Sequence, residues 1–159
     1  KRQATNDEWQ KIIDYEQNDV NDMGRVMAPA AIDTLYNHLK ETNRSVDYYD
    51  LILTGDLGIY GKDIMIDYMK KNYDIDLSKN YNDCGVMLYD LENQEEVRAG
   101  GSGPVCSALV NYGYIFNMLK EKKLKRVLLI ATGALFSPIM LYQKENIYSI
   151  AHAISLEVE

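Results

Sequence analysis

The residues of this chain that could do chemistry gather around a glycine-rich turn, Gly100-Gly101-Ser102-Gly103-Pro104. Proline suits the first position of a helix, so we expect a helix to begin here with its first backbone N–H groups unpaired. These groups and the positive end of the helix dipole could bind an anion. Ser102 could cap the helix or donate to a ligand. Glycines also permit close packing of loops, so both interpretations stand at this point.

Two further side chains flank this turn, Arg98 before it and Cys106 after it. Arg98 is the nearby cation, which could pair with a carboxylate of a ligand or could simply be solvated at the end of a strand. Cys106 falls in the first turn of the expected helix, where the helix dipole lowers the pKa of a thiol. Most cysteines in such positions are instead small buried apolar residues.

Other small, polar residues follow two apolar runs that are expected to be buried strands. Asp56 lies in Gly55-Asp56-Leu57-Gly58, and Thr132 lies in Thr132-Gly133-Ala134-Leu135. In open α/β sheets, ligands bind beyond the carboxyl ends of the strands, so these loops and the glycine turn could form one site. His152 is a candidate for the same pocket, or a histidine paired within the core. His38 is expected to face solvent.

Composition excludes several classes of protein. The net charge of −7 and the absence of a Lys/Arg stripe argue against a nucleic-acid partner. No apolar run is long enough to span a membrane, and the start of the chain does not resemble a secretory signal. The two cysteines have no metal-ligand spacing. We find no catalytic triad, zinc-protease motif, phosphate loop or complete dinucleotide motif, and predict no cofactor, metal site or catalytic residue.

The elements that must position these residues alternate between strands and helices, which predicts one α/β domain with crossover connections. The apolar stripe of the third expected helix, the one that begins at the glycine turn, is Val105, Leu109, Tyr112, Phe116 and Leu119. The expected strands are 5–16, 49–54, 85–90, 126–132 and 151–158. The expected helices are a first one opening at 27–31 with Pro29 in its first turn, a second over about 62–72, and the one that begins at the glycine turn.

Several separated segments resemble the stage V sporulation protein AD family, which is thiolase-like. They are Asp22-Met23-Gly24, 27–31, 49–58, Asp83-Cys84-Gly85, 100–103, 131–135 and 150–153. The resemblance covers nearly the whole chain and corresponds to the C-terminal half of the family protein. It implies that residues 1–159 are a C-terminal thiolase-like domain whose N-terminal half is absent, a view that the initial Lys1 and polar start also favour.

The implied fold is a thiolase-like half: a five-stranded, mixed, mostly parallel sheet flanked by helices on both faces. Thiolases and ketoacyl synthases carry their nucleophilic cysteine in the half that is absent here. The loops 55–58 and 100–103 resemble those that carry the catalytic partners, yet neither contains His or Asn. The resemblance therefore implies a protein that is not an enzyme.

The family resemblance implies binding of dipicolinic acid, with or without calcium, as part of a membrane transport assembly in sporulation and germination. The expected ligand-binding residues are Asp56, Arg98, Gly101, Ser102, Gly103, Cys106, Thr132 and His152. Implied partners are other proteins of the channel assembly, the missing N-terminal half and a second copy in a homodimer. The implied location is peripheral, at the cytoplasmic face of the spore inner membrane. The alternatives are a residual acyltransferase that uses Cys106 and a purely structural assembly protein.

Overall fold

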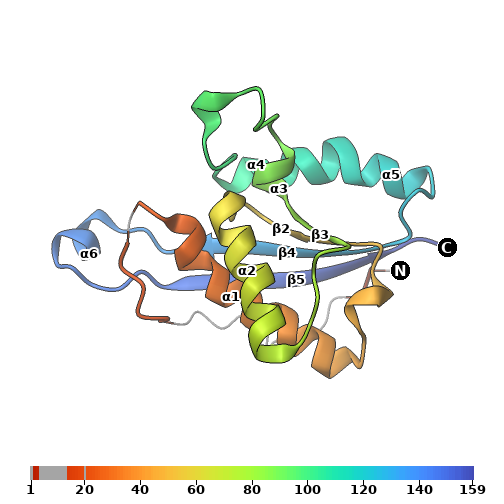
Figure 1. The fold of residues 1–159 in the computed structure, drawn as a ribbon, viewed down its shortest axis with the longest axis horizontal. Helices are drawn as coiled ribbons and strands as arrows, with labels where there is room; N and C mark the ends of the chain where they lie inside the picture. The colour runs from red at the N-terminus through yellow and green to blue at the C-terminus, as the bar shows by residue number, and fades with distance from the viewer. Residues whose placement is uncertain (1, 4–13, 20) are drawn as a thin grey trace.

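The computed structural model describes residues 2–3, 14–19 and 21–159, which form a mixed β-sheet with helices on both faces (Figure 1). The body of the sheet consists of four strands: β2 (Leu51–Thr54), β3 (Tyr81–Asp83), β4 (Arg126–Ala134) and β5 (Ser149–Glu157). A two-residue strand, β1 (Arg2–Gln3), pairs with β5 and gives the order β1-β5-β4-β2-β3. The sheet that was expected to have five strands is thus four-stranded apart from this short edge.

The strand directions differ from the expectation of a mostly parallel sheet. β2 is parallel to both β3 and β4, whereas β4 and β5 are antiparallel, as are β5 and β1. The reason is the connection between β4 and β5, residues 135–148. It contains only the short helix α6 (Pro138–Tyr142) and returns the chain at the same end of the sheet, so no crossover takes place.

Helices cover both faces of the sheet, as expected. On one face, α1 (Met23–Thr42) and α2 (Gly58–Tyr73) pack over Ile52, Leu128 and Ile130. On the other face lies one continuous helical segment, composed of α4 (Pro104–Val110), the π-helix η4 (Asn111–Ile115) and α5 (Phe116–Lys120). Its buried side packs against Leu53 and Val127. The odd and even residues of β2 and β4 therefore face different cores, as the alternation of strand side chains requires.

The expected strand at 85–90 is wrong, because the strand β3 ends at Asp83 and a short helix, α3 (Cys84–Met87), follows it. The Asp83 side chain causes this change of structure. Its carboxylate accepts hydrogen bonds from the backbone N–H groups of Gly85 and Val86, which is how an aspartate caps a helix start. Two short 3-10 helices, η2 (Val46–Tyr48) and η3 (Glu95–Val97), complete the described elements.

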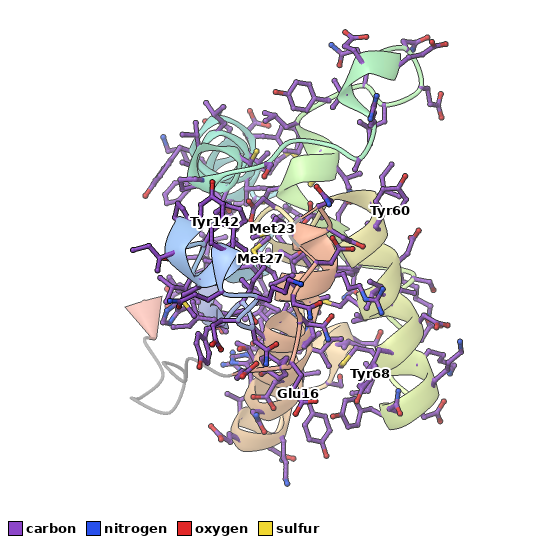
Figure 2. The ribbon with its side chains drawn as sticks, turned by 90° about the vertical axis from the view of Figure 1, so that its left-hand side faces the viewer. Glu16, Met23, Met27, Tyr60, Tyr68 and Tyr142 are labelled. Carbon is purple, nitrogen blue, oxygen red and sulfur yellow. The ribbon has the colours of Figure 1, made fainter. Side chains whose placement is uncertain are left out.

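The first two long helices begin earlier than expected. Helix α1 starts at Met23 because Asp22 caps it by accepting a hydrogen bond from the backbone N–H of Arg25, and Pro29 lies inside the helix. Helix α2 starts at Gly58 rather than near residue 62. Figure 2 shows Met23 and Met27 at the N-terminal end of α1. Most of the edge strand expected at 5–16 lies outside the described residues, and residues 14–16 are not in a strand.

The apolar stripe expected to be the buried face of the third helix is mostly exposed. We name its four exposed members the apolar ridge; the exposed fractions are 61% for Val105, 53% for Leu109, 73% for Tyr112 and 39% for Phe116. Only Leu119 of the expected stripe is buried, together with Cys106, Val110 and Ile115 on the other side of the segment. Among the described residues, no helix is both long and apolar enough to cross a membrane.

Candidate ligand-binding site at the carboxyl ends of the parallel strands

The carboxyl ends of the parallel strands β2, β3 and β4 point the same way, and four segments meet there. These are the loop 55–58 after β2, the first residues of α3 (84–86) after β3, the loop 99–103 before α4 and the last residues of β4 (132–134). The parallel pairing aligns Thr54 with both Asp83 and Ile130, so the ends of β2 and β3 lie beside β4, which continues to Ala134. The expected convergence of the segments after β2 and at the end of β4 with the glycine turn is confirmed, since Asp56 bonds to both Gly103 and Thr132.

Asp83, at the end of β3, ties two of these loops together. It is fully buried, and its carboxylate accepts hydrogen bonds from the Thr54 hydroxyl (2.7 Å) and from the backbone N–H groups of Leu57 (2.9 Å) and Gly58 (3.0 Å). It also caps α3. Burial raises the pKa of Asp83, and the hydrogen bonds from Thr54 and the backbone oppose that rise. The Asp83 carboxylate thus accepts hydrogen bonds from backbone N–H groups at the N-terminal ends of both α2 and α3.

The glycines of the expected ligand-binding turn serve close packing between loops. The Gly101 N–H donates to the Gly85 carbonyl oxygen at 2.8 Å, and a Cβ atom at Gly85 would lie 2.3 Å from the Gly101 carbonyl oxygen. A Cβ at Gly101 would lie 2.7 Å from the Cys106 sulfur. Gly58, with a φ of +67°, similarly approaches the carbonyl oxygen of Ala99. For Gly101, the packing interpretation is therefore the one that the structure supports.

An anionic side chain already lies at the start of α4. One carboxylate oxygen of Asp56 accepts a hydrogen bond from the Gly103 N–H at 2.7 Å, and the other accepts one from the Thr132 hydroxyl at 3.2 Å. Asp56 is half-buried, and Ser102, next to Gly103, is exposed and does not cap the helix. We call Asp56, Gly103 and Thr132 the Asp56 site. The Asp56 carboxylate thus already accepts a hydrogen bond from one of the N–H groups that were expected to bind an anion.

Cys106 lies next to this site but is not an activated thiol. Its side chain is buried, and burial raises the pKa of the Cys106 thiol, with the negative charges of Asp56 and Asp83 adding to the rise. The expectation that the helix dipole would lower this pKa is wrong, because burial and two carboxylates outweigh it. Cys84 is fully buried, and burial raises the pKa of its thiol to about 12.

Two of the expected site residues are not brought to the Asp56 site by any contact in the described part of the chain. Arg98 is exposed and has a left-handed backbone with a φ of 56°. His152, half-buried in β5, pairs with Ala131, the residue before Thr132. Because paired residues of neighbouring strands share a face and successive residues alternate, the side chains of His152 and Thr132 point to opposite faces of the sheet.

The central residue of the loop cluster, Asp83, was not among the expected site residues, and neither was Thr54. The signal that could have found Asp83 is an aspartate immediately before Cys-Gly, because aspartate is a residue type that typically caps a helix start. Its contacts to Leu57 and Gly58 come from far along the chain and leave no local pattern. In the described ranges, no group of three or more His, Cys, Asp or Glu side chains could hold a metal ion.

Two comparisons relate the sequence of this chain to known proteins. The family model described as Stage V sporulation protein AD matches residues 2–157. A protein of Bacillus subtilis (strain 168) named Stage V sporulation protein AD is 48% identical to this chain over 147 residues. The match covers 92% of this chain and 43% of that protein, so the chain spans less than half the length of the relative.

Proposed function

The chain belongs to the stage V sporulation protein AD family, which gives it a role in sporulation, and we propose that it carries a non-catalytic binding site for dipicolinic acid in its calcium form. In this proposal the protein acts as a peripheral component of a transport assembly at the spore inner membrane. The thiolase-like ancestry of the fold is part of the same proposal.

The observation that carries the proposal is the half-buried Asp56 carboxylate, held between the Gly103 N–H and the Thr132 hydroxyl. Dipicolinate is a dianion, and Asp56 would repel it. Calcium reverses this interaction, because Ca²⁺ takes six to eight oxygen ligands and a carboxylate is among its preferred ones. Each oxygen of Asp56 accepts one hydrogen bond here, which leaves lone pairs for a cation.

The surroundings of Asp56 fit a metal that arrives with its ligand. The described residues contain no cluster that could hold a bare metal ion. Calcium dipicolinate brings a nitrogen and two carboxylates to the metal, so the protein needs to add only a few oxygens. Asp56 and the exposed hydroxyl of Ser102 are such oxygens, and the exposed Arg98, which precedes this loop, is the cation nearest to Ser102 along the chain.

The proposal is best tested by titration calorimetry on a full-length family protein that contains this chain. Dipicolinate should bind when calcium is present and at least about tenfold more weakly without it. Asp56→Asn should weaken binding of calcium dipicolinate about tenfold, because a charged metal ligand is lost. The matched control is Asp63→Asn, an exposed charge on α2, which should leave binding unchanged. Calcium-independent binding, or equal binding by Asp56→Asn, would contradict the proposal.

The apolar ridge favours a second role, assembly with the rest of the family protein. Monomeric proteins rarely expose contiguous apolar side chains such as those of Val105, Leu109 and Tyr112. More than half of the B. subtilis relative lies outside the match, so its remaining part is the occupant that we propose for this ridge. The acyltransferase alternative gains no such support, because the Cys106 pKa is raised.

A further inference from the structure

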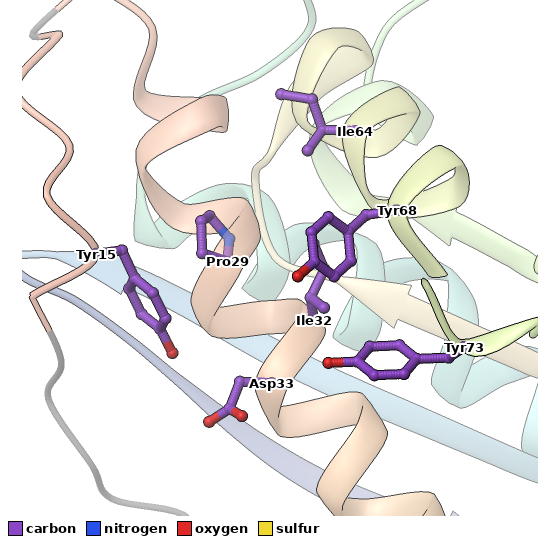
Figure 3. Close-up of a pocket in the computed structure, with 7 residues that line it drawn as sticks. All are labelled: Tyr15, Pro29, Ile32, Asp33, Ile64, Tyr68 and Tyr73. Carbon is purple, nitrogen blue, oxygen red and sulfur yellow. The ribbon is translucent and has the colours of Figure 1, made fainter. Parts of the chain in front are cut away.

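A cavity separate from the Asp56 site lies between α1, α2 and the segment that precedes α1 (Figure 3). Its volume is about 220 Å³, and its lining is Tyr15, Pro29, Ile32, Asp33, Ile64, Tyr68 and Tyr73. Figure 3 shows the Tyr15 and Tyr73 hydroxyl groups pointing inward from opposite sides, with Asp33 below them. Three aromatic rings and one carboxylate therefore surround a small apolar space.

Asp33 provides the charge of this cavity. Its carboxylate accepts a hydrogen bond from the Asn37 side-chain amide at 3.0 Å, and no Lys or Arg of the described ranges forms an ion pair with it. The Asp33 charge reaches two of the phenols. Burial and then Asp33 raise the pKa of Tyr15 to about 12, and burial and the neighbouring tyrosines, with Asp33, raise the pKa of Tyr73.

This combination selects one class of ligand. The Asp33 carboxylate attracts cations, and a ring face that is left free adds to this attraction through the ring quadrupole. Tyr68 provides such a ring, whereas one face of Tyr73 is already stacked on Tyr36. A bare metal ion would need several hard oxygen ligands, whereas the cavity lining contains a single carboxylate. An anion such as dipicolinate would be repelled by Asp33. Pro29, Ile32 and Ile64 instead favour a cation that carries methyl or methylene groups.

We propose that the cavity between α1 and α2 binds a small organic cation, an alkylammonium group enclosed by Tyr15, Tyr68 and Tyr73 and paired with Asp33. None of these residues belongs to the Asp56 site. Tyr68 and Tyr73 are 44% and 36% exposed, so the rings are accessible from solvent without opening the core. The site is therefore independent of the proposed binding of calcium dipicolinate.

Titration calorimetry with choline tests the proposal, and 3,3-dimethyl-1-butanol, its neutral isostere, serves as the comparison ligand. Choline should bind at least about tenfold more tightly than the neutral alcohol, because shape and apolar surface are the same and only the charge differs. A second titration uses Nα-acetyl-lysine amide, whose side-chain ammonium is free. It distinguishes a free quaternary ammonium ligand from the primary ammonium of a lysine side chain.

Three variants locate the binding. Asp33→Asn should weaken choline binding at least about fivefold, and Tyr68→Leu should have a similar effect while Tyr68→Phe retains binding, because the ring and not the hydroxyl is required. The matched control is Asp67→Asn, which removes an exposed charge next to Tyr68 on α2 and should leave binding unchanged. If Asp33→Asn does not fold, the comparison of the two Tyr68 variants decides. Equal binding of the neutral alcohol, binding of neither ammonium probe, or unchanged binding in Asp33→Asn and Tyr68→Leu would overturn the proposal.

Discussion

At the scale of single residues, Asp83 holds the candidate site together. We expect Asp83→Asn to lower the free energy of unfolding by about 2–4 kcal/mol, because the amide cannot accept all the hydrogen bonds from Thr54, Leu57 and Gly58 and leaves buried donors unpaired. Urea denaturation measures the change. Asp63→Asn, on exposed α2 surface, should stay within about 0.5 kcal/mol of the unmodified chain. An equal effect of both substitutions would show that Asp83 is not a structural clamp.

His38 is buried, whereas the sequence indicated that it faces solvent. Its burial predicts that the free energy of unfolding depends on pH. The Tyr49 hydroxyl accepts a hydrogen bond from Arg44 at 3.0 Å and forms a second hydrogen bond with His38 Nε2. Burial, followed by the nearby Arg44 charge, lowers the pKa of His38 from 6.5 to about 4. His38 is thus neutral in the folded chain at pH values where the unfolded chain binds a proton.

The resulting effect has a definite sign and window. The unfolded state binds more protons between pH 6.5 and 4, so the contribution of His38 to stability is complete above 6.5 and is lost as the pH falls to about 4. The loss amounts to at most about 3 kcal/mol. Denaturation curves across this range should show it, and His38→Gln should reduce the slope. The same slope in both proteins would contradict the assignment.

The thiols of Cys84 and Cys106 should be unreactive in the folded chain. This expectation tests the interpretation that Cys106 is not a catalytic nucleophile. Burial raises the pKa of both Cys84 and Cys106, so little thiolate forms near neutral pH. Alkylation by iodoacetamide at pH 7.5, followed by mass spectrometry, should be at least about tenfold slower than in urea-unfolded protein. Fast and selective modification of Cys106 would instead revive the acyltransferase alternative.

At the scale of elements, the sequence predicted best what depends on local composition. The runs that became β2 and β4 are continuous and apolar because both of their faces are buried, and this pattern is local. The start of α2 was missed because Asp83, a residue far along the chain, accepts hydrogen bonds from its first N–H groups, whereas the cap of α3 by the same carboxylate is local. The Asp56 contact to Gly103 was likewise not predictable, since it joins residues on two separate loops.

The close packing of α3 against the loop before α4 predicts that replacing Gly85 by a larger residue destabilises the chain. Gly85→Ala should lower the free energy of unfolding by more than about 2 kcal/mol, because its Cβ would lie 2.3 Å from the Gly101 carbonyl oxygen and the backbone must move. Gly113→Ala is the matched control, since a Cβ there meets no atom within 4 Å. It should be neutral or stabilise the helical segment by up to about 1 kcal/mol. Thermal unfolding of the two variants distinguishes these outcomes, and comparable destabilisation by both would contradict the packing role of Gly85.

At the scale of the whole molecule, the sheet separates two hydrophobic cores, one on each face. The apolar ridge, in contrast, belongs to neither core in the described part of the chain. The π-helix η4 turns Ile115 toward the core while Tyr112 remains exposed. A periodicity that indicates an apolar face cannot tell whether the chain itself or another segment covers that face. The match covers only 43% of the relative, which favours the second case.

This interpretation predicts opposite sensitivities in two contexts. In the 159-residue chain, Leu109→Ser and Tyr112→Ser should change the free energy of unfolding by less than about 0.5 kcal/mol, because both side chains are exposed. In a full-length family protein that contains this chain, each should cost about 1.5–3 kcal/mol, the value for an apolar side chain that is buried. Tyr142→Ser, in α6 and 90% exposed, is the control outside the ridge and should be neutral in the 159-residue chain and in the full-length protein alike. Denaturation of the paired variants measures the difference, and ridge substitutions that remain neutral in the full-length protein would show that the rest of the chain does not cover this face.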